Sequence, residues 1–166
     1  SPYARPGHWN DPDMLVVGWV GWSDRLRPTR LSPTEQYTHL SLWSLLSAPL
    51  LIGCDLSRID PFTFNLLANP EVLAINQDAL GKAAERVLDQ ENIQVWAKEM
   101  ADGSQAVGLF NLADEGRSVR LQWSSLRLPK GLSQMRDVWQ QQDMGKMGDT
   151  YEIALPAHGS KLLLLK

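Results

Sequence analysis

Two patterns of hydrophobic and polar positions divide the chain near residue 83. Before this point, apolar residues recur at helical spacing or form short unbroken runs, whereas after it they alternate with polar residues. The run LLI at residues 50–52 is typical of a parallel strand that is covered on both faces. Strands that alternate with helices predict an α/β architecture for the first part, and period-two alternation predicts half-buried strands for the second.

Capping residues mark three helix starts in the first part. Ser32 supplies an N-cap oxygen, and Glu35, three positions later, completes a capping box. We expect this helix to pack one side inward and to end at Pro49. Asp60 and Asn69, each followed by a proline, indicate two further short helices.

The second part contains several segments that alternate like strands. The sequence ADGS at residues 101–104 is expected to form a hairpin turn, because Gly103 can adopt a positive φ. The run LLLL at residues 162–165 predicts a final apolar strand, and we expect the sheets of this part to close their own core. The alternating apolar positions are Ile93, Val95 and Ala97; Val119, Leu121 and Trp123; and Tyr151, Ile153 and Leu155.

A dense group of polar side chains occurs at residues 6–15, which read PGHWNDPDML. In an extended strand Asp11 and Asp13 would share a face, which is costly unless hydrogen bonds or a ligand compensate the two charges. Pro12 suits a strand end better than a central position, because it has no N–H to donate. Since Asn, Asp and Pro are also the usual turn residues, a plain turn is the alternative interpretation.

Composition excludes several classes of function. A net charge of −3 over 166 residues gives no basis for binding nucleic acid or an anionic membrane. Cys54 is the only cysteine, which excludes an intramolecular disulfide. The three histidines, His8, His39 and His158, lack the spacing of metal ligands, so we expect neither a metal nor another cofactor. His39 is interpreted as a helix residue rather than as a catalytic base.

Residues 6–15 closely resemble the seventh-strand motif of the α-galactosidase and α-N-acetylgalactosaminidase enzymes, glycoside hydrolase family 27. Three further segments agree in the right order: EQYTHLSLW at residues 35–43, SAPLLIGCDL at residues 47–56 and EVLAINQD at residues 71–78. The resemblance implies an α/β part followed by an all-β part, namely the end of a (β/α)8 TIM barrel and an antiparallel β-sandwich. Residues 1–83 would be the last two β/α units, and residues 84–166 the sandwich.

The resemblance also implies a retaining mechanism, in which one aspartate attacks the anomeric carbon and another serves as acid and base. In the family these two aspartates end the fourth and sixth strands, so both would precede this chain. We therefore expect no catalytic residue here and no turnover by the isolated chain. Asp11 and Asp13 are rejected as a substitute pair, because neighbours on one strand cannot flank a glycosidic bond from opposite sides.

By the same resemblance, Asp13 and Met14 line the sugar pocket. Asp13 would accept hydrogen bonds from sugar hydroxyls, and Met14 would offer an apolar wall to the C–H face of the sugar. Trp9, Asn10 and Asp11 would support the strand end, although turn stabilisation remains the alternative for Asn10 and Asp11.

The segment at residues 18–31 is longer than the corresponding connection in the animal and plant enzymes and is expected to be a loop on the active-site face. It could shape a leaving-group subsite or be a packed surface loop.

The expected partners are an α-galactoside or related glycan and the N-terminal part of the barrel. Galactose, N-acetylgalactosamine and arabinopyranose cannot be distinguished as substrates, and a secreted or periplasmic location is favoured for the parent enzyme.

Two other functions stay open at this point. The chain could be a non-catalytic carbohydrate-binding or interaction module whose functional unit is the sandwich. It could also be one piece of a nicked or split enzyme whose second piece supplies the rest of the barrel.

Overall fold

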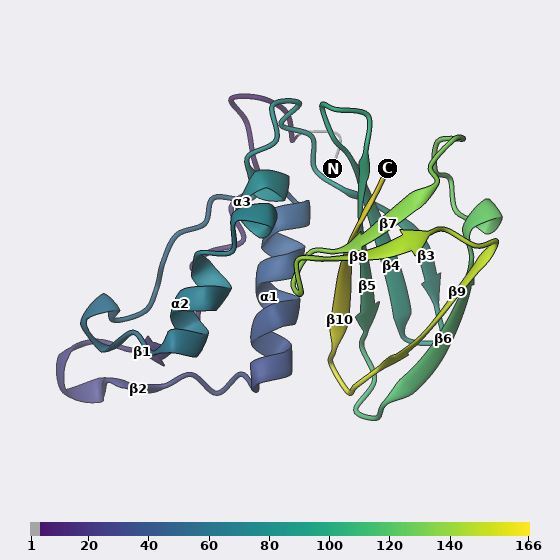
Figure 1. The fold of residues 1–166 in the computed structure, drawn as a ribbon. Coiled ribbons are helices and arrows are strands. Elements are labelled where there is room, and N and C mark those ends of the chain that lie inside the picture. Colours follow the sequence, from purple (N-terminus) through teal and green to yellow (C-terminus); the bar gives the residue numbers. More distant parts are fainter. Residues whose placement is uncertain (1–3) are drawn as a thin grey trace.

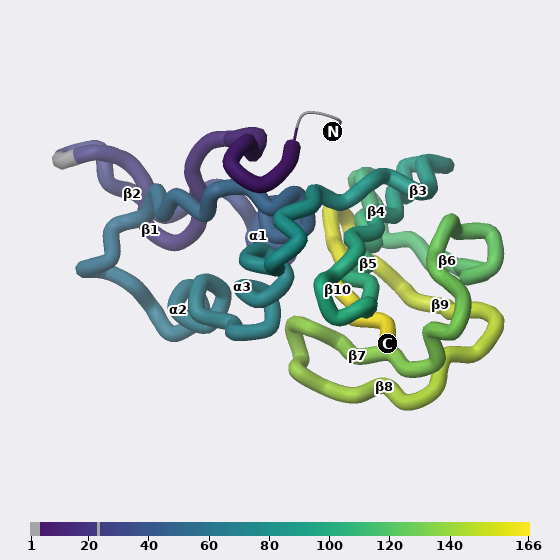
Figure 2. Tube along the Cα trace, turned by 90° about the horizontal axis from the view of Figure 1, so that it is seen from above, coloured from purple at the N-terminus to yellow at the C-terminus, as the bar shows by residue number. Residues whose placement is uncertain are grey.

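The computed structural model describes residues 4–166, in which two helices, α1 and α3, pack against one face of a β-sheet and a third, α2, packs on α1 (Figure 1). Seen from above, the helical part lies on one side of the large sheet and strands β6 and β9 lie on the other (Figure 2). The elements of the helical part are β1 (Trp19–Val20), the 3-10 turn η1 (Ser23–Arg25), β2 (Arg27–Pro28), α1 (Pro33–Leu45), η2 (Leu56–Arg58), α2 (Pro61–Leu67) and α3 (Pro70–Asn76).

The predicted helix starts are confirmed. Ser32 Oγ accepts a hydrogen bond from the Glu35 N–H, and Glu35 Oε2 accepts one from the Ser32 N–H, which completes the capping box of α1. Asp60 caps α2 through the Thr63 N–H, and Asn69 caps α3 through two N–H groups.

The predictions that α1 ends at Pro49 and that it packs only one side inward were wrong. The helix ends at Leu45, and Ser47 then adopts a φ of +51°, so the chain turns away before Pro49. The helix is also buried on more than one side. Leu40 packs in a core with α2, whereas Leu45 packs in a second core against the sheet.

The first part contains the predicted parallel pairing, although in a short form. Leu15 pairs with Ile52 in a single parallel bridge. The expectation that residues 50–52 are covered on both faces was wrong for this chain, since Leu51 and Ile52 are 46% and 48% exposed. The segment at residues 18–31 is also more ordered than a loop, because β1 and β2 pair as a small antiparallel hairpin within it.

The second part is the predicted antiparallel sandwich. A six-stranded sheet has the order β3-β4-β5-β10-β7-β8, and β6 and β9 form a separate two-stranded sheet. Side chains from both sheets form a shared core that includes Val95, Leu109, Leu121 and Leu163. The strands are β3 (Glu85–Gln90), β4 (Ile93–Glu99), β5 (Gln105–Asn111), β6 (Arg117–Gln122), β7 (Gln134–Asp137), β8 (Gln142–Lys146), β9 (Thr150–Leu155) and β10 (Ser160–Leu165), with the 3-10 turn η3 (Trp123–Ser125) after β6.

The hairpin turn predicted at residues 101–104 connects β4 and β5. Gly103 has a φ of +85°, and its N–H donates a hydrogen bond of 3.0 Å to the carbonyl oxygen of Met100. The predicted last strand is β10, which lies between β5 and β7.

The sheets close a core between them, but the six-stranded sheet buries its other face as well. All seven residues of β5 are buried, because the second face packs on α1 and α3 through Phe110, Leu162 and Val138. The prediction that β4 is half-buried was therefore wrong on its polar side. Lys98, which alternation would place toward solvent, is only 1% exposed.

Both outer strands of the six-stranded sheet are irregular. The register between β3 and β4 shifts between Arg86 and Leu88, and the register between β7 and β8 shifts between Met135 and Arg136. Each shift adds a bulge that bends the strand locally.

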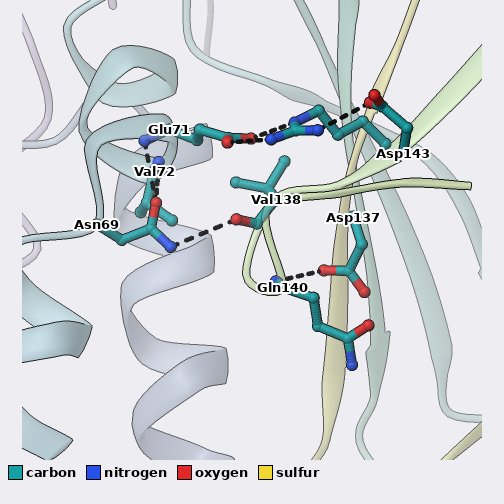
Figure 3. A network of polar contacts seen from close by, with 8 residues as sticks. Asn69, Glu71, Val72, Asp137, Val138, Gln140 and Asp143 are labelled. Atoms are coloured by element: carbon teal, nitrogen blue, oxygen red, sulfur yellow. Dashed lines mark hydrogen bonds and ion pairs between the residues drawn. The ribbon is translucent and has the colours of Figure 1, made fainter.

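Polar contacts join the helices to the sheet. The guanidinium of Arg136 donates two hydrogen bonds, of 2.7 and 2.8 Å, to the Glu71 carboxylate of α3 and one of 2.8 Å to Asp143 of β8; Figure 3 labels the two carboxylates. Asn69 donates a hydrogen bond of 3.3 Å to the carbonyl oxygen of Val138 in the same region. Arg136 is thus an ionic connection between the two parts of the chain.

Candidate functional site

The candidate site lies where residues 13–16 run beside residues 51–55. The Leu15 N–H donates to the Leu51 carbonyl oxygen (2.7 Å), and the Gly53 N–H donates to the Leu15 carbonyl oxygen (3.1 Å). Leu15 is buried in the core with α1 and α2. Met14 and Val16, which alternate with it, are 41% and 43% exposed on the side away from this core.

Three side chains of α1 hold the backbone of this segment. Trp43 Nε1 donates to the Asp13 carbonyl oxygen (3.0 Å), His39 Nε2 accepts from the Val16 N–H (3.2 Å), and Gln36 Oε1 accepts from the Gly18 N–H (3.2 Å). These contacts were not predicted. The spacing of the three residues at i, i+3 and i+7, which places them on one helix face, was the available signal.

The contact made by His39 requires a neutral imidazole, because only a ring nitrogen without a proton can accept a hydrogen bond. Burial lowers the pKa of His39, which favours this neutral form. The ring also packs edge-on against Trp43, with ring centroids 4.0 Å apart. His39 is a residue of α1, as predicted, with a defined backbone partner.

The extended geometry considered for Asp11 and Asp13 is not formed. Residues 9–14 lie outside the strands, and Asp13 has a φ of +77°, which Asp tolerates better than most residues. Asp11 Oδ1 accepts from the Asp13 N–H (2.9 Å), and Asp13 Oδ1 accepts from the Met14 N–H (2.7 Å). Asp13 is an exposed residue, and among residues 4–166 its second carboxylate oxygen has no hydrogen-bond partner.

The other residues predicted to support the site, Trp9, Asn10 and Asp11, make different contacts. Trp9 Nε1 donates to the carbonyl oxygen of Gly81 (3.0 Å), so Trp9 ties this segment to the start of the sandwich. A Cβ atom on Gly81 would lie 3.3 Å from the Trp9 ring, and the φ of Gly81 is +58°. Asn10 is exposed, whereas Asp11 lies beside Asp13.

Met14 lines a cleft of about 540 Å³ between residues 52–55 and the β1–β2 hairpin. The hairpin is fixed to this edge, because the Asp55 N–H donates to the Trp19 carbonyl oxygen (2.8 Å) and Val20 forms a bridge with Cys54. Trp22 at the hairpin tip also lines the cleft and is 81% exposed. The segment at residues 18–31 therefore borders the space beside Met14.

Titratable groups in this cleft show no sign of an activated nucleophile. Burial raises the pKa of the Cys54 thiol, which keeps it protonated. Hydrogen bonds from Ser57 lower the pKa of Asp55, whose carboxylate caps η2. In the part of the chain that the structure describes, no three His, Cys, Asp or Glu residues cluster as metal ligands, and no helix is long and apolar enough to cross a membrane.

Comparison with known proteins agrees with this geometry. Residues 1–78 match the family described as alpha galactosidase A, and residues 90–165 match the alpha galactosidase C-terminal beta sandwich domain. The chain is 36% identical over 165 residues to the α-galactosidase of Cyamopsis tetragonoloba, covering 98% of this chain and 38% of that protein. It therefore spans well under half the length of this relative.

Solved structures show the same arrangement. α-Galactosidase I from Mortierella vinacea superposes with a TM-score of 0.86 at 30% identity, over 98% of this chain and 40% of that one. A GH27 β-L-arabinopyranosidase from Geobacillus stearothermophilus superposes with a TM-score of 0.88 at 33% identity, over 96% of this chain and 37% of that one. In sequence and in structure, then, the chain belongs to the α-galactosidase family, glycoside hydrolase family 27, and corresponds to its C-terminal portion, the end of the catalytic barrel followed by the β-sandwich.

Proposed function

We propose that this chain is the C-terminal part of a retaining glycoside hydrolase that cleaves terminal α-linked galactose from oligosaccharides or glycoconjugates. The relatives named as α-galactosidases support the reaction class. The observation that carries the proposal is the exposed side of residues 13–16. Met14 is exposed there, and one carboxylate oxygen of Asp13 has no hydrogen-bond partner among residues 4–166, while Trp43 of α1 holds the backbone.

In this proposal Asp13 binds sugar rather than attacking it. Its unpaired carboxylate oxygen accepts a hydrogen bond from a sugar hydroxyl, and Met14 packs against the C–H face of the ring. Asp11 supports Asp13 by accepting from the Asp13 N–H, and Trp9 fixes the preceding segment against Gly81. Asn10 lies between these two supporting residues in the sequence.

The remainder of the barrel is the expected partner of this chain. Residues 1–83 would form the last two β/α units and residues 84–166 the sandwich, so the nucleophile and the acid/base aspartate would come from the missing portion. The exposed apolar side chains of Val16, Leu51 and Ile52 support this, since strands inside a closed barrel are covered.

The test is hydrolysis of p-nitrophenyl α-galactoside by the purified 166-residue chain and by a full-length protein that contains it. We expect turnover from the full-length protein and none from the chain alone, because binding residues cannot replace a nucleophile and an acid/base. The β-L-arabinopyranoside, assayed in parallel, decides between the two sugar classes of the relatives. Turnover by the chain alone that disappears in Asp11→Asn or Asp13→Asn would contradict the proposal.

A second candidate function, carbohydrate binding without catalysis, is favoured by one observation. A cleft separate from the one beside Met14 lies between α1 and the sandwich, and Tyr37 and Trp139 are among its lining residues.

A further inference from the structure

A cleft of about 280 Å³ opens between the first turns of α1 and the sandwich, and it shares no lining residue with the cleft beside Met14. Tyr37 comes from α1, Trp139 and Gln140 come from the turn after β7, and Lys161 comes from β10. Ligand sites are commonly found at such junctions between structural units.

Two aromatic rings on this cleft are held rigidly. Tyr37 and Trp139 pack edge to face, with ring centroids 4.7 Å apart and planes at 77°. Trp139 Nε1 donates to Ser41 Oγ (2.8 Å), and Tyr37 also packs edge-on against Phe62. Because these contacts fix both rings in advance, a ligand would not have to order them.

Polar groups beside the rings remain available. The Gln140 N–H donates to Asp137 Oδ1 (3.0 Å), which fixes the turn, while the side chain of Gln140 extends away without a marked contact (Figure 3). Among residues 4–166, neither the Gln140 side-chain amide nor the Tyr37 hydroxyl has a hydrogen-bond partner. The buried hydroxyl of Ser160, which also lines the cleft, has no partner among these residues either.

The charged groups of the cleft cancel each other. Asp137 is 1% exposed and forms an ion pair with Lys161, the other charged residue that lines the space. A charged ligand would have to compete with one member of this ion pair for the other. The hydroxyl groups of a neutral ligand could instead form hydrogen bonds to Asp137 or Lys161 without breaking the pair. The volume is slightly below the range of pockets for drug-sized ligands, which favours a molecule as small as one sugar ring.

We propose that this cleft is a second binding site, specific for a single neutral pyranose unit. The aromatic rings contact the C–H face of the sugar, whose partial positive charge suits the negative face of an aromatic ring. Gln140 and the Tyr37 hydroxyl bond to its hydroxyl groups. This proposal does not depend on the proposed hydrolase activity.

The test is an NMR titration of the isotope-labelled 166-residue chain with D-galactose and D-glucose, with glycerol as the control. We expect saturable shifts of the Trp139 indole and the Gln140 side-chain amide with at least one of the two sugars and none with glycerol. Tyr37→Phe and Gln140→Ala should each weaken binding about threefold to tenfold, since each removes one hydrogen-bonding group. Gln142→Ala, on the exposed strand β8, is the matched control and should bind like the wild type.

The outcomes separate the two proposals. A methyl shift at Met14 without any saturable shift at Trp139 would support the proposed function and overturn the second site. Saturable shifts at Trp139 and Gln140 with no response at Met14 would support the second site alone. An equal response to glycerol, or wild-type affinity in both Tyr37→Phe and Gln140→Ala, would also overturn the second site.

Discussion

The ammonium group of Lys98 in β4 donates a hydrogen bond of 2.7 Å to the hydroxyl of Ser47, just beyond the end of α1. Lys98 also donates to the Ile75 carbonyl oxygen, so a single buried side chain joins the sheet to α3 and to the segment that follows α1. Ser47 in turn donates to the Lys82 carbonyl oxygen (2.9 Å), which carries the connection on to the segment before β3. The two parts of the chain therefore share a buried polar contact.

Lys98 should make the stability of the protein pH-dependent. Burial lowers its pKa to about 8 from 10.5, and the nearby Asp78 offsets only part of this. Between these two values the unfolded chain binds more protons at this residue, so the free energy of unfolding should rise with pH. Relative to Lys98→Met, we expect the wild type to gain about 2 kcal/mol between about pH 7 and pH 9.5 in urea unfolding. Lys146→Met, on exposed β8, should follow the wild type; parallel curves for Lys98→Met and wild type would contradict the prediction.

Arg136 should stabilise the interface through its geometry as well as its charge. Arg136→Lys keeps the charge but cannot make the two-point contact with Glu71. Because these side chains are only partly exposed, we expect a loss of about 1 kcal/mol in the free energy of unfolding. Urea denaturation measures it. Arg120→Lys on β6 is the control, and an equal effect of both substitutions would show that the bidentate contact is unimportant.

His39 should protect the Val16 amide from hydrogen exchange. His39→Leu removes the acceptor and should speed exchange of this amide about threefold to tenfold, whereas His39→Gln retains an acceptor and should exchange more slowly than His39→Leu. Because burial lowers the pKa of His39, its stabilising effect is complete above the usual value of 6.5 and is lost as the pH falls below that value. The Gly53 amide, bonded to Leu15, is the internal reference. An unchanged exchange rate of the Val16 amide in His39→Leu would show that His39 does not protect this amide.

Asp13 should affect binding more than chemistry in a full-length enzyme. Asp13→Asn keeps a residue that tolerates positive φ, and it removes the charge. We expect kcat/KM to fall about tenfold to a hundredfold. Asp149→Asn, on the surface of the sandwich, should leave kcat/KM unchanged. Almost complete loss of activity that azide restores would instead identify Asp13 as the nucleophile.

A fragment of residues 84–166 alone should not be a stable, monodisperse monomer. Removing α1 and α3 would expose the second face of the six-stranded sheet, including Phe110, Val138 and Leu162. We expect this fragment to bind a hydrophobic dye and to self-associate in size-exclusion chromatography, whereas the whole chain should do so less. A monomeric fragment without dye binding would show that the sandwich is an independent domain.

Local chemistry explains which elements were predictable. The capping box of Ser32 and Glu35 and the turn at Gly103 depend on neighbouring residues only, so the sequence predicted them correctly. The end of α1 depends on the left-handed backbone of Ser47, which no helix-stop signal marks. Pro49 predicted the latest possible end of the helix, but the helix ends earlier, at Leu45.

Tertiary packing explains what was not predictable. The alternation of apolar and polar residues in β4 suggests a solvent-exposed polar face, but the helices cover that face and enclose Lys98. The resemblance to a known family pointed to Asp13 and Met14, but it did not show the positive φ of Asp13. The hydrogen bonds from Trp43 to the Asp13 carbonyl oxygen and from the Val16 N–H to His39 join segments that are distant in the sequence. Such contacts leave only a weak trace in the sequence, here the spacing of residues along one face of α1.

The register shifts in the two outer strands have a consequence for the protein at high concentration. A strand from a neighbouring molecule can extend a sheet only if its backbone groups meet a regular row of partners. At one edge the row is broken near Arg86, and at the other edge it is broken beside Arg136, with charged residues along both strands. We therefore expect strands of neighbouring molecules to pair poorly with either edge of this sheet.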